Sequence, residues 1–158
     1  MLKFSRKTDY GLIALRHMAH KGESEVSSAR EIADQYGISY ELVSKILQKL
    51  KKHKLIDSVQ GVAGGYRISR KPDEVTLFNF LETLEGPLGM IECAREDEGQ
   101  PCAVTGCNIM TPMQELNRKI MRVLQETTLA DLFRTSGAPV QLAQIERLEE
   151  EQRAVAAK

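Results

Sequence analysis

The three cysteines are the residues whose type and spacing best suit chemistry. Cys93, Cys102 and Cys107 lie within fifteen positions of a 158-residue sequence, with eight residues between the first two and four between the last two. Glycine and proline interrupt this segment, and neither a helical nor a strand period runs through it, so we expect a loop. A loop this long has little reason to be ordered by itself, and three thiols predict a bound group that orders it.

Thiolate sulfur is a soft ligand that suits iron–sulfur clusters, Cu(I) and zinc. A closed zinc site usually takes four ligands, often from closely spaced cysteine pairs, and this loop has three cysteines and no such pair. The histidines, His17, His20 and His53, are distant in sequence. We therefore favour an iron–sulfur cluster, while zinc and inert or redox-paired thiols stay open.

The composition restricts the class of protein. With 42% apolar residues the chain is able to form a compact core as one or two small domains. It has no apolar run near the ~18 residues of a membrane span, and no long apolar stretch follows its basic N-terminus as in a secretory signal. We expect a cytoplasmic protein without a membrane partner, in a reducing compartment where clustered cysteines indicate metal or redox chemistry.

The formal net charge is zero, but it is unevenly distributed. Residues 1–75 contain 14 Lys and Arg against 9 Asp and Glu, whereas residues 76–158 contain 8 against 13. A basic half joined to an acidic half is typical of a nucleic-acid-binding module attached to a second unit.

Two helices are predicted at the start of the chain. Residues 8–20 are apolar on most sides, which indicates a buried helix, and Thr8 or Asp9 is placed to cap it. A second helix is predicted to begin at Ser27 or Ser28, and Ser28 forms a capping-box pattern with Glu31.

A third helix, residues 39–52, follows the break at Gly37. Apolar residues occupy one continuous face at spacings of three and four, and the opposite face is polar and cationic. Two helices joined by a glycine turn in this way predict a helix-turn-helix. The lysines also suit a solvated helix end, where cations are favoured near the C-terminal dipole. The apolar face consists of Val43, Ile46, Leu47 and Leu50.

Residues 55–60 and 66–69 are short strand candidates separated by a glycine-rich turn, which predicts a β-hairpin. A hairpin directly after a recognition helix is the wing of a winged helix, and its glycines would let backbone N–H groups approach a phosphate. From their position on these elements we expect contacts with double-stranded DNA from Ser28, Ser39, Tyr40, Glu41, Ser44, Lys45, Gln48, Lys49, Lys52, Gln60, Gly64, Gly65 and Tyr66.

The exposed residues of the third helix divide by chemistry. Side chains able to contact base edges are Glu41, Ser44, Lys45 and Gln48. Lys49 and Lys52, together with the wing backbone, are expected to hold phosphates.

The second half of the chain predicts a helix after Thr76, the cysteine loop, and a long amphipathic helix from Pro112 to about Thr127. This long helix either covers the winged helix of its own chain or pairs with a second copy of itself, and we favour pairing. Thr128 is expected to cap a final short turn. The predicted fold is mainly α: an N-terminal winged helix-turn-helix with a small β-wing, a cysteine loop and a long C-terminal dimerisation helix. The expected divisions are 1–75 (DNA binding), 76–133 (helix, cluster loop and dimer helix) and 134–158 (marginal helix or disordered tail).

Several motifs together resemble the bacterial IscR/NsrR family of iron–sulfur-sensing winged-helix regulators, most of all regulators of the SUF cluster-assembly operon. The resemblance implies a homodimer with one cluster per subunit, 4Fe–4S or 2Fe–2S, that controls genes of cluster assembly or stress response. The motifs are the helix-turn-helix, the cysteine triplet, Thr8-Asp9-Tyr10-Gly11, Gly64-Gly65-Tyr66-Arg67, Leu84-Glu85-Gly86-Pro87 and Thr128-Leu129-Ala130-Asp131.

The resemblance makes Cys93, Cys102 and Cys107 the three cysteine ligands. The position of the histidine ligand of IscR is Met110 here, whereas the position of the aspartate ligand that NsrR takes from the partner subunit is Asp9. The alternatives are that Asp9 is a simple helix cap, and that water or a small ligand is the fourth ligand.

An enzyme is not expected, because the sequence has no nucleophile–base set, phosphate loop or histidine-rich site.

Helix-turn-helix dimers bind paired half-sites roughly 34 Å apart, which predicts a palindromic operator. Two other functions stay open: a thiol-redox or zinc-dependent repressor, and a winged-helix adaptor that binds protein instead of DNA.

Overall fold

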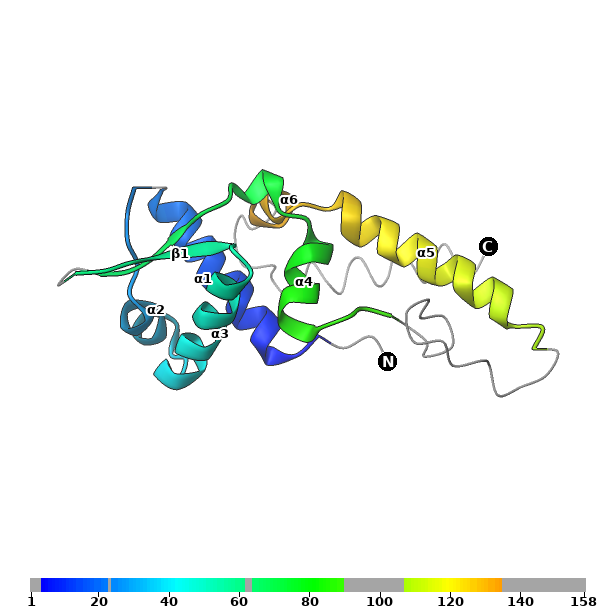
Figure 1. The fold of residues 1–158 in the computed structure, drawn as a ribbon, viewed down its shortest axis with the longest axis horizontal. Helices are drawn as coiled ribbons and strands as arrows, with labels where there is room; N and C mark the ends of the chain where they lie inside the picture. Colours follow the sequence, from blue (N-terminus) through cyan, green and yellow to red (C-terminus); the bar gives the residue numbers. More distant parts are fainter. Residues whose placement is uncertain (1–3, 23, 62–63, 90–106, 135–158) are drawn as a thin grey trace, which may run out of the picture.

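The computed structural model describes residues 4–22, 24–61, 64–89 and 107–134. The predictions for Cys93, Cys102 and the tail from residue 135 lie outside the described residues. Figure 1 shows a body of short helices with a hairpin at one end and the helix α5 extending from the other. The elements are α1 (Arg6–Lys21), α2 (Ala29–Tyr36), α3 (Tyr40–Lys52), β1 (Ile56–Val59), β2 (Gly65–Ile68), η1 (Pro72–Glu74), α4 (Leu77–Glu85), α5 (Met110–Glu126) and α6 (Leu129–Arg134).

These elements confirm the predicted fold class, a mainly helical chain with one small antiparallel sheet. No helix in the described ranges is long and apolar enough to cross a membrane.

The start of α1 differs from the sequence prediction, which had Thr8 or Asp9 as the cap. The helix begins at Arg6 with Ser5 at its N-cap, so Thr8 and Asp9 already lie inside it. Ser5 makes no side-chain cap bond within its own helix; its N–H and Oγ instead donate to Glu85 Oε1 at 3.0 and 2.6 Å. A carboxylate from α4 therefore closes this helix end, which no local pattern indicates.

The capping box at the start of α2 is confirmed. Glu31 N–H donates to Ser28 Oγ at 3.0 Å, and Ser28 N–H donates to Glu31 Oε2 at 3.4 Å. Glu31 Oε1 also lies 3.0 Å from Nε2 of the buried His17 and pairs with Lys21. Burial raises the pKa of the Glu31 carboxyl, but hydrogen bonds from Lys21 and His17 outweigh it and lower that pKa. An ionised carboxylate thus joins α1 to α2.

The apolar face predicted for α3 forms the centre of the core. Val43, Ile46, Leu47 and Leu50 are each at most 3% exposed. They pack among α1, α2 and α4, which surround one side of α3 (Figure 1). Burial on one side leaves the other side of this helix on the surface.

The hairpin is fastened to the start of α2 by an additional bridge. β1 and β2 pair antiparallel, with Ile56 opposite Ile68. On the other side of β2, Ser27 N–H donates to Tyr66 O at 2.8 Å and Tyr66 N–H donates to Ser27 O at 2.9 Å. A Cβ on Gly65 would lie 2.6 Å from Ser27 O. Gly65 therefore allows two backbone segments to approach closely.

The chain returns to the body after α5. Thr76 caps α4 by accepting from Asn79 N–H at 3.2 Å. Leu77 N–H donates to Thr127 O at 2.7 Å, so the start of α4 and the end of α5 lie together. Thr128 caps α6 as predicted, with Asp131 N–H donating to Thr128 Oγ1 at 3.1 Å. α5 begins at Met110, two residues earlier than the predicted start at Pro112.

Replacing Gly65 by alanine is expected to destabilise the fold by about 1–3 kcal/mol, the usual cost of overpacking. The new methyl group would meet the Ser27 carbonyl, a backbone atom that moves only if the bridge to Tyr66 opens. Urea unfolding of the variant and wild type measures the change. Ser58→Ala, at an exposed position of β1, is the matched control and should stay within ~0.5 kcal/mol of wild type. Equal midpoints for Gly65→Ala and wild type would contradict this role.

Candidate nucleic-acid interface

One side of α3 presents polar side chains on a rigid support. Tyr40 is 48% exposed, and Glu41, Lys45 and Gln48 are also exposed, while Ser44 is half-buried. Since the opposite face of the helix is buried, these side chains keep a constant orientation relative to the body. A helix of this kind is able to enter the major groove and contact base edges.

The N-terminus of α3 has free hydrogen-bond donors. Ser39 occupies the N-cap, is exposed, and makes no side-chain cap bond. Leu42 N–H donates to Ser39 O at 3.1 Å, whereas no acceptor among the described residues takes the N–H groups of Tyr40 and Glu41. These two N–H groups lie at the positive end of the helix dipole. Together with the Ser39 hydroxyl they suit a phosphate oxygen. The hydroxyl of Ser28, by contrast, is already engaged in the capping box of α2.

Arg30 is a residue that the sequence analysis missed. Its guanidinium lies 5.0 Å from the centre of the Tyr40 ring, a cation–π contact between the first turn of α2 and the first residue of α3. The contact orients Tyr40 and adds a cation beside the predicted base-contacting residues. In the sequence, the signal for Arg30 is its position two residues after Ser28, a predicted DNA contact.

The two lysines expected to hold phosphates differ in surroundings. Lys49 Nζ donates to the backbone carbonyl of Leu84, at 2.8 Å, near the end of α4. The Lys52 side chain is exposed and makes no hydrogen bond or ion pair with any part of the chain that the structure describes. Lys52 is therefore free for phosphate, whereas Lys49 already has a partner.

The wing glycines have internal roles beside the predicted one. Gly64 N–H donates to Gly61 O at 2.9 Å, which closes the turn. Both backbone polar groups of Tyr66 bond to Ser27, as described above. Gln60 is exposed at the end of β1. Contact of these four residues (Gln60, Gly64, Gly65 and Tyr66) with DNA stays a prediction.

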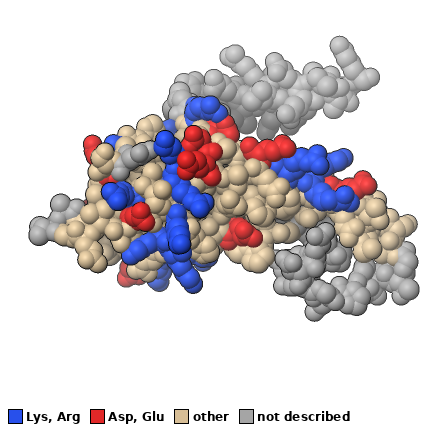
Figure 2. Space-filling view, turned by 45° about the horizontal axis from the view of Figure 1, so that its top comes forward, with Lys and Arg blue, Asp and Glu red and all other residues tan. Residues whose placement is uncertain are grey.

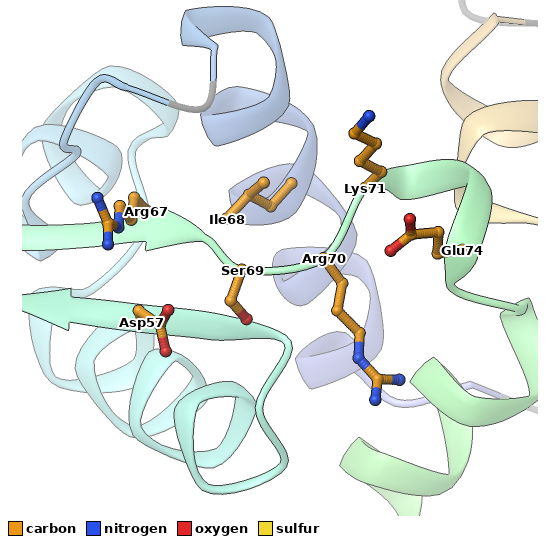
Figure 3. Close-up of a pocket in the computed structure, with 7 residues that line it drawn as sticks. All are labelled: Asp57, Arg67, Ile68, Ser69, Arg70, Lys71 and Glu74. Atoms are coloured by element: carbon orange, nitrogen blue, oxygen red, sulfur yellow. The ribbon is translucent and has the colours of Figure 1, made fainter.

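A shallow hollow lies at the root of the hairpin, beside η1 (Figure 3). Arg67, Arg70 and Lys71 line it together with Asp57 and Glu74. Figure 3 shows Arg70 and Lys71 pointing to opposite sides, with Arg67 further along β2, so the three cations do not converge on one point. The arrangement is a cationic surface and lacks the convergence that a small anion site needs. Figure 2 shows Lys and Arg side chains on the body and a second group toward the right of the view, with Asp and Glu side chains among them.

Among the predicted cluster ligands, the described residues include Cys107 and Asp9. Cys107 is a free, half-buried thiol three residues before the first residue of α5. Asp9 is exposed on α1 and makes no hydrogen bond or ion pair with the described residues. No group of three or more His, Cys, Asp or Glu side chains suited to a metal occurs within those same ranges.

The buried helix-turn-helix, the exposed face of α3 and the anchored hairpin define the class of protein, a winged-helix DNA-binding transcription regulator. The chain matches the Rrf2 family, described as iron-dependent transcriptional regulators, over residues 4–135, and it belongs to that family. It is a transcription regulator and not an enzyme.

Individual relatives agree with this assignment. The regulator NsrR of Shouchella clausii is 28% identical over 131 residues, which cover 83% of this chain and 88% of that protein. The structure of CymR, the global cysteine regulator of B. subtilis, has a TM-score of 0.71 at 26% identity and covers 87% of this chain and 100% of its own. The structure of IscR from T. potens has a TM-score of 0.65 at 26% identity and covers 86% of this chain and 89% of its own.

Replacing Glu41 by alanine should reduce sequence discrimination more than affinity. The exposed carboxylate in the first turn of α3 is placed to accept from cytosine, and its loss removes one base contact, worth about 1–3 kcal/mol of discrimination. The measurement compares binding to a duplex that wild type selects from a random pool with binding to a mixed-sequence duplex. Glu82→Ala, an exposed change on α4, is the control. Equal loss on both duplexes would remove Glu41 from base contact.

Proposed function

We propose that this regulator is a homodimer that senses an iron–sulfur cluster and controls genes of cluster assembly. Cys93, Cys102 and Cys107 would hold one cluster per subunit, 4Fe–4S or 2Fe–2S, with Asp9 of the partner subunit as the fourth ligand. The observation that carries the proposal is a free cysteine thiol at the start of α5 in a member of an iron-dependent regulator family.

Cys107 suits a ligand role. Its thiol is not in a disulfide, and it is half-buried, so it is neither sealed in the core nor fully in water. It lies two residues before the N-cap of α5, and a cysteine sulfur is the ligand that iron–sulfur clusters take. When bound, the cluster supplies a group whose loss or oxidation signals iron and redox status.

Asp9 suits a fourth ligand better than the sequence alone indicated. The alternative role was capping of α1, but Ser5 occupies the N-cap and Glu85 of α4 binds the first turn. The Asp9 carboxylate is consequently exposed and without a partner in the described ranges. A carboxylate is more easily displaced than a thiolate, so it is a suitable point for a sensor to release its cluster.

The dimer is proposed to form through α5. Ile109, Leu116 and Val123 are 58%, 42% and 60% exposed, and they recur at intervals of seven. At about 100° per residue this stripe lies roughly a quarter turn from Leu124, which is buried against the body. An apolar stripe with this period on a helix that extends from the body (Figure 1) suits a second copy of itself. A dimer with two recognition helices binds a palindromic operator.

A thiol-redox regulator is the second candidate. One structural relative, CymR, is named the global cysteine regulator, and cysteine chemistry without iron would use the same free thiol at Cys107. The colour and iron content of anaerobically prepared protein separate the two functions.

Anaerobic reconstitution with ferrous iron and sulfide should give wild type a visible absorption band and bound iron. Cys102→Ala and Cys107→Ala should lose both, because each removes a thiolate ligand. Asp9→Asn should change the spectrum and hold the cluster less tightly. The matched control is Asp34→Asn, an exposed aspartate on α2 that should behave as wild type.

Equal iron, sulfide and absorbance in wild type and the cysteine variants would end the cluster proposal. An Asp9→Asn spectrum and DNA response identical to those of Asp34→Asn would remove Asp9 from the site.

Replacing Leu116 by glutamate should convert the dimer to monomer at micromolar protein. A charge in the centre of the apolar stripe cannot be buried without a partner. Light scattering after size exclusion measures the mass. Arg118→Glu changes charge on the opposite side of α5 and should keep the dimer mass. If Leu116→Glu also kept it, the two subunits would pair elsewhere.

A further inference from the structure

Leu84 and Glu85, the last two residues of α4, are the point where three elements meet. Lys49 of α3 donates a hydrogen bond to the carbonyl of Leu84, and Ser5 at the start of α1 donates two to the carboxylate of Glu85. We propose that Lys49 is a positioning residue that ties the recognition helix to this end of α4, so that a change at the cluster reaches α3 through it. The inference rests on the proposed cluster site and assigns the residues that transmit its state.

The bond from Lys49 has a structural purpose of its own. Its Nζ lies 2.8 Å from Leu84 O, and Leu84 is 3% exposed. The last carbonyls of a helix have no partner within that helix, and a cation is favoured at this negative end. The ammonium thus satisfies a carbonyl at the end of α4 that the helix leaves open. A phosphate would have to compete for it.

Glu85 holds the start of α1 with the same helix end. Its Oε1 accepts from the N–H and Oγ of Ser5, at 3.0 and 2.6 Å, and from Thr8 Oγ1. Burial raises the pKa of this carboxyl, but hydrogen bonds from Ser5 and Thr8 outweigh it and lower that pKa, so Glu85 is ionised at neutral pH. Thr8 directly precedes Asp9, the proposed ligand.

Helices α1 and α4 are also closely packed against each other. A Cβ on Gly11 would lie 2.6 Å from Leu84 Cδ1 and 3.1 Å from Phe80 Cζ, so α1 and α4 are in close contact at this glycine. A displacement of the start of α1 therefore moves the end of α4 with it, because packed helices shift as units.

Both cluster sites of the proposed dimer connect to this point. Asp9, which would bind the cluster of the partner subunit, is attached through α1. Cys93, which would bind the cluster of its own subunit, follows Glu85 by eight residues along the chain. The bond to Leu84 O comes from Lys49, a residue of α3. Lys49 lies one residue after Gln48 and one turn after Lys45, and the side chains of both residues are exposed on the proposed DNA-binding side. Lys49 is thus a direct polar connection from the end of α4 to the recognition helix.

The test compares Lys49→Met, which keeps the apolar stem and removes the ammonium, with Lys52→Met on the same helix. In cluster-free protein, binding to a mixed-sequence 30-base-pair duplex is measured over a series of salt concentrations. Each lost phosphate contact lowers the salt slope by about one unit, so a dimer that carries Lys52→Met should lose about one unit per subunit bound, and Lys49→Met should not. A slope for Lys49→Met that falls as far as that of Lys52→Met would overturn the proposal.

The second measurement is the ratio of affinities of reconstituted and cluster-free protein for the duplex that wild type selects from a random pool. Lys49→Met should bring this ratio closer to one by about threefold or more, as expected for loss of a coupling residue. Lys49→Arg, which keeps a cationic donor, should retain the wild-type ratio. Glu85→Ala should also bring the ratio closer to one, with an unchanged salt slope. A wild-type ratio in Lys49→Met would also overturn the proposal.

Failure of the proposed function gives a different result. Wild type that binds the selected duplex equally in both forms would contradict cluster sensing. The salt slope of cluster-free Lys49→Met would still decide whether Lys49 serves α4 or DNA.

Discussion

Burial of one face of α3 is the constraint on which the rest of this structure depends. Its four core residues are at most 3% exposed and pack among α1, α2 and α4. Because that face is enclosed, Glu41, Lys45 and Gln48 project from a support that cannot rotate. The hairpin adds a second fixed point, since its bridge from Tyr66 to Ser27 joins it to the start of α2. A winged helix able to recognise DNA is the consequence of this packing.

Two ionised carboxylates connect the helices around that centre. Glu31 links α1 and α2 through His17 and Lys21, and it also completes the capping box of its own helix. Glu85 links α4 to the first turn of α1 and takes the place of a local cap. In both cases hydrogen bonds stabilise the charged form more than burial opposes it. Helix ends are therefore held by neighbouring elements, which makes them sensitive to movement of those elements.

The proposed sensor uses this property. Asp9 and Cys107 lie at the starts of α1 and α5, which are helix ends and not sheltered core positions. A group bound to Asp9 and Cys107 would therefore change the orientation of α1 and α5 relative to the helices around them. In the proposed dimer, the apolar stripe of α5 would provide the contact between two such subunits, and the distance between their recognition helices would then depend on how each α4 is held.

Local patterns in the sequence determined much of this protein. The period of Val43, Ile46, Leu47 and Leu50, the Ser28–Glu31 box, the caps at Thr76 and Thr128 and the paired strands each involve residues close in the chain, so sequence spacing predicts them. Tertiary structure alone decided the cap of α1 by Glu85, 80 residues away, the bond of Lys49 to Leu84, and the approach of Gly65 to Ser27. These contacts join distant segments, and they form only after burial of the core has brought the helices together; no period or short motif encodes them.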